Sequence, residues 1–427
     1  MIIEEHARLE LFLPDGRTFE ISESDIIQNS LSVTSQCVNG NTFVFGCVSP
    51  AQLSVKIRIK DQNIGRYDVY GGAIILYSWF GEHPPSSGGK RGVFNVTAVT
   101  KKDDIFTISA VDNICLLDTE AFINNGNAVF NRLGSAGLYW NAIQVLDMLV
   151  TENLIPLDFW GKHILFKKFP DNDVQIPNAI AHFGGYGVSK DESGKFEYPY
   201  QEVRLVLLLS GEESDNIRDY VSWISEYMGG FVCAGTDGEI QFRLFETPYY
   251  HPEPKQLDHS EFEQNSLEIA GFQIYLYSAK VILEDRQWRS CTGYQKGGNG
   301  VINLESVIQN NPFTEFIYQS HKLDMLPIVE SLYYYQKNIQ IRPFSGTYHG
   351  KEYLHLGQYI EITDKEGTSY GTTITNINWK FRGGQQIRCV GEDSRTLSQA
   401  RKRSQAVRMG ERLKTQINRL RNDLTGG

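Results

Sequence analysis

Long apolar runs, a leader-like start and paired cysteine motifs are all missing from this sequence of 427 residues. Its apolar stretches, such as residues 73–76, are far shorter than the roughly 20 residues of a membrane-spanning helix. The first residues show no basic segment followed by an apolar one, so we expect no signal peptide. The six cysteines are scattered without a C-x-x-C pair, which favours reduced, structural thiols in a protein made in the cytosol.

Catalytic and metal-binding motifs are also missing. The nine histidines show neither H-x-H nor H-E-x-x-H spacing, and there is no G-x-S-x-G nucleophile elbow. Glu352 and His355 have the spacing of a helical two-metal site. Glycines flank that segment and leucines alternate within it, so it is predicted to be a strand with an incidental histidine. The sequence therefore predicts no catalytic residue, no cofactor and no metal ligand, and a protein that is not an enzyme.

What the sequence does contain favours strands and turns, with 12% aromatic residues and 39 glycines. Residues 9–13 alternate, turn at Pro14-Asp15-Gly16 and return along 18–21, which predicts a hairpin. Residues 53–60 alternate over eight positions, as in a half-buried antiparallel strand. A second hairpin is expected from 93–99 and 106–112. The region 1–118 is thus predicted to be a tube-like β-barrel or sandwich.

The middle region, 119–250, mixes helix and strand. An apolar stripe at helical spacing predicts a helix over 138–153. A second helix is expected to begin at Ser214 or Asp215 and to end at the glycine pair 229–230. A hairpin over 231–245 follows at once, so this region reads as an α/β insertion.

Strands dominate again from 251 to 394, with a helical excursion near 312–340. The segments 96–99 and 107–112 resemble 374–377 and 387–393, and the second copy is three residues longer. This weak match hints at two related β-domains around a different middle one. The predicted fold class is therefore α+β, mainly β, with two tube-like antiparallel β-barrel domains flanking an α/β domain and a C-terminal helix.

Charge is unevenly distributed along the chain. The net charge of −10 combines +7 over 395–427 with −17 over the remainder. The basic segment 395–424 has no proline or aromatic residue, and an apolar seam follows its heptads, which predicts a helix. We expect the helix to bind protein partners through Val407, Leu413, Ile417, Leu420 and Leu424, with Arg412 and Arg419 beside this seam. A solvated helical face and a nucleic-acid arm are the weaker alternatives, because no aromatic residue interleaves the basic ones.

Three groups of segments carry a family resemblance. The first group comprises residues 23–26, 43–46, 53–57, 66–68, 72–73, 92–96 and 108–113. The second is the predicted helix and hairpin, at 218–225, 229–231 and 237–240. The third is Asn311-Pro312, then residues 332–335, then Arg342-Pro343-Phe344. In this order they resemble the baseplate-hub and tail-tip hub proteins of tailed phages and related contractile particles, including the N-terminal module of prophage tail-associated proteins.

The resemblance implies a structural protein of the virion tail, assembled in the bacterial cytoplasm. Hubs of this kind are homotrimers in which each subunit supplies two tube-like barrels, so that three chains adapt a hexameric tail tube to a threefold spike. The implied partners are the chain itself, a tail tube or distal tail protein, a spike or fibre protein and a tape-measure protein, with DNA only in transit through the channel. The alternative is a β-rich, carbohydrate-active or cell-wall-degrading enzyme, or a tail-associated peptidase.

Overall fold

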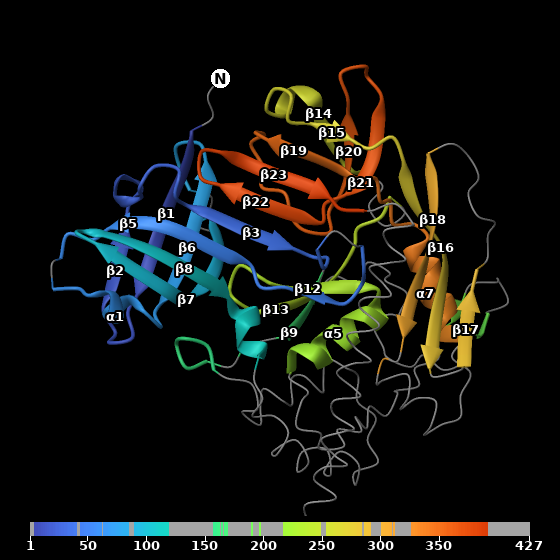
Figure 1. Cartoon of the computed structure of the whole chain (residues 1–427), viewed down its shortest axis with the longest axis horizontal. Coiled ribbons are helices and arrows are strands. Elements are labelled where there is room, and N and C mark those ends of the chain that lie inside the picture. The colour runs from blue at the N-terminus through green and yellow to red at the C-terminus, as the bar shows by residue number, and fades with distance from the viewer. Residues whose placement is uncertain are drawn as a thin grey trace, which may run out of the picture.

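The computed structural model describes residues 4–40, 43–61, 63–84, 89–118, 157–162, 164, 166–169, 189–190, 196–197, 217–248, 253–283, 286–291, 300–309, 311 and 326–391. Strands dominate these residues, so the predicted fold class, mainly β with some helix, is confirmed (Figure 1). The predicted helices over 138–153 and 395–424 lie outside the described residues. The domain boundaries at 118, 250 and 394 remain predictions.

One large, curled sheet of 11 strands organises the molecule. Its strands, in spatial order, are β15 (Glu268–Ile269), β19 (Phe344–Tyr348), β23 (Gly384–Cys389), β22 (Asn376–Lys380), β3 (Ser32–Gln36), β5 (Gln52–Arg58), β8 (Ile105–Asp112), β7 (Lys90–Lys102), β6 (Ala73–Phe80), β1 (Glu5–Phe12) and β2 (Thr18–Ile21). The strands of the first and last thirds of the chain thus share one sheet.

Local sequence patterns explain the predicted strands well. In β5 every second residue is buried, and Leu53, Val55 and Ile57 are at most 1% exposed. Gly16 adopts a φ of 89° in the turn between β1 and β2, a conformation that glycine reaches without a steric penalty. The hairpins β1–β2 and β7–β8 form as predicted.

Four smaller sheets complete the described fold. The first has four strands, β4 (Cys47–Val48), β12 (Gly230–Ala234), β13 (Ile240–Leu244) and β9 (Phe166–Phe169). The second has three strands, β14 (Lys255–Asp258), β20 (Tyr359–Thr363) and β21 (Ser369–Thr373). The others are β17 (Arg286–Ser290), β16 (Gln273–Leu283) and β18 (Val301–Gln309), and the pair β10 (Ser189–Lys190) and β11 (Phe196–Glu197). The predicted hairpin after the second helix is β12–β13, so that expectation is confirmed.

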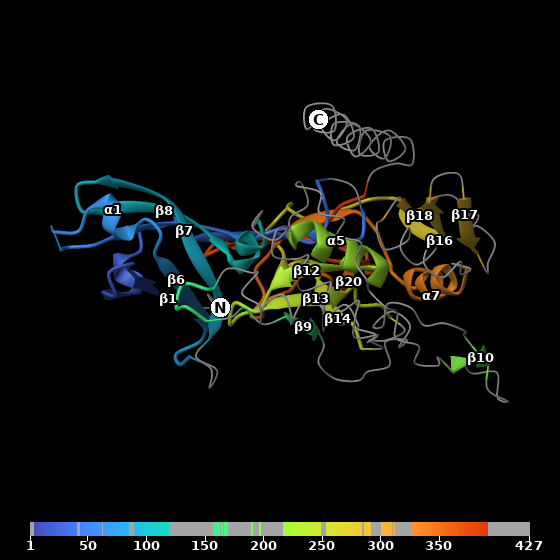
Figure 2. The same ribbon diagram turned by 90° about the horizontal axis from the view of Figure 1, so that it is seen from below.

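The described residues include three α-helices. They are α1 (Arg66–Val69), α5 (Ile217–Met228) and α7 (Leu326–Gln336), with short 3-10 turns η1 (Glu23–Asp25), η2 (Asn113–Leu117) and η3 (His259–Glu261). Helix α5 ends at Gly229, whose φ of 70° is the left-handed exit that the sequence predicts. Helix α7 packs against β16 and β17 at the end of the molecule opposite β1 and β6 (Figure 2).

The internal similarity is much stronger in three dimensions than in sequence. In the first copy, Ile27 N donates to Lys56 O at 2.8 Å and Lys56 N donates to Ser30 Oγ at 3.1 Å. In the second copy the same two bonds, at 2.8 and 3.1 Å, are formed by Glu263, Thr347 and Ser266. Each loop also holds an asparagine with positive φ, 58° at Asn29 and 63° at Asn265. We name residues 18–112 the first unit and residues 255–391 the second unit.

The hairpin at the end of each unit carries a matching threonine hydrogen bond. Thr97 Oγ1 donates to Ser109 O at 3.2 Å, and Thr375 Oγ1 donates to Arg388 O at 3.1 Å. The predicted match of 96–99 with 374–377 is therefore confirmed. The predicted match of the returning strand is wrong, because Ile108 corresponds to Ile387 and the second turn is only one residue longer. Gly391 stands at the position of Asp112, and Asp393 lies outside the described residues.

A glycine with positive φ stands at the same place in each unit, but its surroundings differ. Gly71 N donates to Val96 O and Gly357 N donates to Ile374 O, with φ values of 77° and 75° at the two glycines. A Cβ on Gly71 would lie 3.9 Å from Pro14, whereas a Cβ on Gly357 would lie 2.6 Å from Phe231.

Gly71→Ala should therefore cost only the conformational penalty, about 1 kcal/mol, and Gly357→Ala about 2 kcal/mol because the Phe231 ring must also move. Urea unfolding of the two variants measures this difference. Equal losses would show that the Phe231 contact contributes nothing.

Candidate functional site

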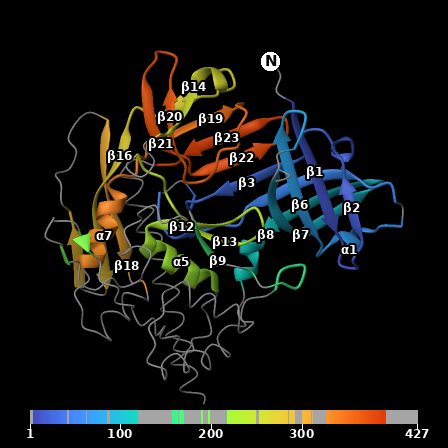
Figure 3. The same cartoon turned by 180° about the vertical axis from the view of Figure 1, so that it is seen from behind.

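The two units meet edge to edge where β22 pairs with β3 (Figure 3). Five antiparallel pairs run from Asn376 opposite Gln36 to Lys380 opposite Ser32. The ladder continues at both ends, because Phe381 N donates to Leu31 O at 3.0 Å and Cys37 N donates to Thr375 O at 2.9 Å. Backbone pairing over this length joins the first and second units into one continuous sheet.

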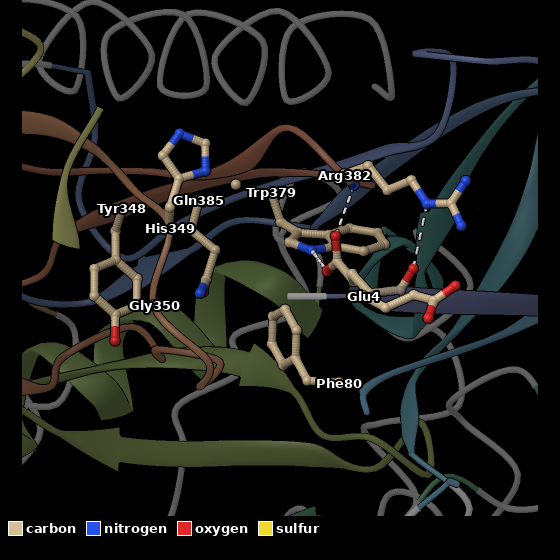
Figure 4. A pocket seen from close by; sticks show the side chains of 10 residues that line it. Glu4, Phe80, Tyr348, His349, Gly350, Trp379, Arg382 and Gln385 are labelled. Carbon is tan, nitrogen blue, oxygen red and sulfur yellow. Dashed lines mark hydrogen bonds between the residues drawn. The ribbon is translucent and has the colours of Figure 1, made fainter. Parts of the chain in front are cut away.

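A buried carboxylate fastens the same junction from the side. Glu5 is only 5% exposed, and its Oε1 accepts hydrogen bonds from Trp379 Nε1 at 2.8 Å and from Tyr353 Oη at 3.2 Å. Its Oε2 accepts Arg382 N at 2.6 Å. The carboxylate thus connects the start of β1 to the end of β22 and the turn that follows it. Figure 4 labels two of its partners, Trp379 and Arg382.

Aromatic and cationic side chains pack around this carboxylate. The rings of Phe80 and Tyr353 stack with centroids 4.7 Å apart, and the Arg91 guanidinium lies 3.6 Å from the Tyr353 centroid. Burial lowers the pKa of Arg91, and the charges of Tyr353 and Glu5 oppose this shift. The cluster draws residues from both units, so it stabilises the junction.

A cavity of about 670 Å³ opens beside Glu5. It lies between the ends of β1 and β6 and the strands β19, β22 and β23. Its titratable lining residues are Glu4, Glu5, Tyr348, His349 and Arg382. The residues that line it include no cysteine, serine or lysine.

The site residues predicted from the sequence, which are Val407, Leu413, Ile417, Leu420, Leu424, Arg412 and Arg419, lie outside the described residues. Glu352 and His355 are described, and they form no common site. Lys255 Nζ lies 2.7 Å from Glu352, whereas His355 Nε2 lies 2.9 Å from Glu246 Oε1. The predicted strand at 352–356 is wrong, since these residues run from a bend at Glu352 through an irregular segment to a turn at Leu356, and the two leucines are buried in the core.

The sequence predicts no catalytic residue, cofactor or metal ligand. Among the described residues, no group of three or more His, Cys, Asp or Glu side chains could hold a metal ion. Within the same part of the chain, no helix is long and apolar enough to cross a membrane. Burial raises the pKa of the Cys47 and Cys389 thiols to about 12, so these two cysteines are unreactive core residues.

One buried acid stands out in the first unit. Asp112 is 3% exposed, and its carboxyl accepts Ala51 N at 2.8 Å and Ile114 N at 3.0 Å. Burial raises the pKa of Asp112 to about 7, while the two backbone N–H groups and Arg218 oppose this shift. The side chain caps η2 and holds the start of β5, which is a structural role.

Sequence reasoning missed the junction and most of the repeat. A usable signal was present, because residues 28–31 and 264–267 both read Gln-Asn-Ser-Leu. Glu5 gave no signal, since nothing near it in the sequence marks it as buried.

Comparisons with known proteins return tail and baseplate structures. The chain is similar to the 43 kDa tail protein of prophage MuSo2 from Shewanella oneidensis, at 9% identity and a TM-score of 0.42, over 90% of this chain and 98% of that one. It is also similar to a prophage tail protein from Listeria monocytogenes EGD-e, at 9% identity and a TM-score of 0.45, over 94% and 99% of the two chains. A component of the E. coli type VI secretion system matches at 9% identity and a TM-score of 0.36, over 87% and 75%.

No protein-family model matches the sequence, and the search of curated proteins returns no match.

Proposed function

We propose that this chain is a structural hub subunit of a phage tail or phage-tail-like contractile particle. Three copies form a ring in which each chain supplies two β-units, and the ring adapts a hexameric tail tube to a threefold spike. The subunit has no catalytic function and belongs to the virion tail or baseplate, after synthesis and assembly in the bacterial cytoplasm.

The observation that carries this proposal is the duplicated unit. Both units repeat the same loop bonds, threonine bond and glycine, and they are joined in a single sheet by β3 and β22. A chain with two equivalent units presents six of them in a trimer, which matches a sixfold neighbour on one face while the chain itself keeps threefold symmetry. The sequence segments that resemble hub proteins lie largely within these two units and the α5–β13 segment.

The basic helix over 395–427 gathers three copies at the ring axis or binds a spike or tape-measure protein. The body of the chain, with its charge of −17, faces the channel, where negative charge keeps DNA from adhering in transit. A tail tube or distal tail protein binds the opposite face of the ring.

The test is the mass of the purified full-length chain in solution. Light scattering coupled to size exclusion should give three times the chain mass of 48.5 kDa, and incubation with peptidoglycan and its peptides should release no product. A monomer that degrades cell-wall material would overturn the proposal in favour of the enzymatic alternative.

A truncation separates the helix from the ring. Deleting 395–427 should abolish either the trimer or the capture of a spike protein in a pull-down. A matched variant keeps the helix but replaces Leu413 and Leu420 with serine, which removes seam residues without changing charge. If the truncated chain assembles and binds the spike unchanged, the helix has no assembly role.

A further inference from the structure

We propose that neighbouring copies join by strand pairing between residues 99–102 of β7 in one copy and residues 268–271, which include β15, in the next. This inference rests on the proposed trimeric ring and specifies its interface. The occupant of each exposed strand edge is thus a second copy of this chain.

The template is the junction inside the chain. In the hairpins, Val99 pairs with Ile108 and Ile377 pairs with Ile387, so the second half of β7 corresponds to β22. Strands β3 and β15 correspond as well, because each follows the Gln-Asn-Ser-Leu loop of its unit and pairs with the strand to which that loop is bonded. This strand is β5 in the first unit and β19 in the second. The intrachain junction therefore joins β3 of the first unit to the β7 equivalent of the second. Its counterpart would join β15 of the second unit to β7 of another copy.

Both edges needed for this counterpart are open in the part of the chain that the structure describes. Strand β6 pairs with β7 only over residues 90–95, so Ala98–Lys102 has β8 on one side and no strand on the other. Strand β15 is the last strand of the large sheet and has only β19 beside it. Figure 1 shows the two segments well apart, on either side of the β3–β22 junction. Within the described residues the two edges do not pair with each other, whereas in a head-to-tail ring each edge meets the other edge of a neighbouring copy.

The register of the template places opposite charges together. Lys380 pairs with Ser32 and Asn378 pairs with Thr34 in the chain's own junction. Transferred to the second interface, Lys102 lies opposite Glu268 and Thr100 lies opposite Ala270 of the next copy. Both Lys102 and Glu268 are exposed, so each is available for this cross-strand ion pair.

The length of the pairing follows from the structure. In the junction between β3 and β22, the backbone bonds at either end are made by Leu31 and Cys37. Backbone groups alternate in direction along a strand, so the odd-numbered residues between them also face β22. The equivalents that would bond to β7 are Ile269 and Gly271. Gly300 closes the far end of this edge, because Gln273 N donates to Gly300 O at 2.7 Å and a Cβ on Gly300 would lie 2.7 Å from Gly271 O, and β18 follows. The interface is therefore a short ladder of four residue pairs.

A disulfide tests the register directly. In a Cys291→Ser background, which removes the exposed native thiol, the double variant Thr100→Cys with Ala270→Cys should form covalent dimers and trimers on mild oxidation. Each single variant should give at most a dimer through its own thiol, and only at high concentration. The matched control is Thr34→Cys with Asn378→Cys at the equivalent positions, which should close an intrachain bridge in the monomer band.

Charge reversal gives a second readout. Lys102→Glu and Glu268→Lys should each raise the trimer dissociation constant about fivefold, and the double reversal should restore it. Lys365→Glu and Glu366→Lys, in an exposed turn, are the controls and should change nothing.

The outcomes separate the two proposals. A wild-type chain that is not trimeric overturns the proposed function. A trimer in which the 34–378 bridge forms but the 100–270 bridge does not, or in which the double reversal fails to restore assembly, overturns this interface alone.

Discussion

Glu5→Ala is expected to lower the free energy of unfolding by about 4 kcal/mol, because it leaves three hydrogen-bond donors without their buried acceptor. Those donors are Trp379 Nε1, Tyr353 Oη and Arg382 N. The 670 Å³ cavity beside them can admit water, which is why the loss is not larger. Urea unfolding followed by tryptophan fluorescence measures the change, since Trp379 lies at the site.

Two variants control this experiment. Glu4→Ala removes an exposed carboxylate at the mouth of the same cavity and should cost less than about 0.5 kcal/mol. Glu5→Gln keeps one acceptor oxygen and should fall between the other two. A loss of stability in Glu5→Ala no greater than in Glu4→Ala would show that the carboxylate does not fasten the junction.

The first unit is expected to become less stable as the pH rises from about 4 to about 7, through Asp112. Its carboxyl has a pKa of about 7 in the folded chain, raised by burial from the ordinary value of 3.8. Between these two values the folded state holds a proton that the unfolded state has lost. The contribution is therefore fully present below pH 3.8 and is lost as the pH rises through 7, by up to about 4 kcal/mol.

Asp112→Asn removes this titration. The difference in unfolding free energy between wild type and variant, measured by urea at each pH from 4 to 8, should change across that window and then level off. Asp103→Asn is the matched control, because Asp103 lies exposed in the β7–β8 turn and should leave the pH profile unaltered. A wild-type profile parallel to that of Asp112→Asn would refute the assignment.

The local elements of this fold were predictable from particular residues. Alternation over 53–60 identified β5, and the Asp-Gly pairs at 15–16 and 237–238 identified the hairpins β1–β2 and β12–β13. The glycine pair after α5 located the end of that helix. These features depend on backbone preferences and on side chains that are close in sequence, so pattern reasoning is sufficient for them.

The segment at 352–356 shows where that reasoning stops. Its alternating leucines are buried as in a strand, but the backbone has no strand beside it, and Gln385 binds it instead through Leu354 N and Glu352 O. Alternating apolar residues show which side of a segment is buried, but they do not show whether a neighbouring strand or a side chain pairs with its backbone. The same limit explains the misplaced register of the second hairpin, where the length of one turn decides the match.

By itself the sequence determined a mainly β chain with a weak internal repeat, an acidic body and a basic end, together with segments that resemble tail hubs. Only the tertiary structure decided that the two units share one sheet through β3 and β22, and that Glu5 and Asp112 are buried. Strand pairing between residues 344 positions apart, as at Thr34 and Asn378, depends on which edges remain open after each unit has folded. No local pattern records that, because an edge becomes a binding surface only when the neighbouring strands are in place.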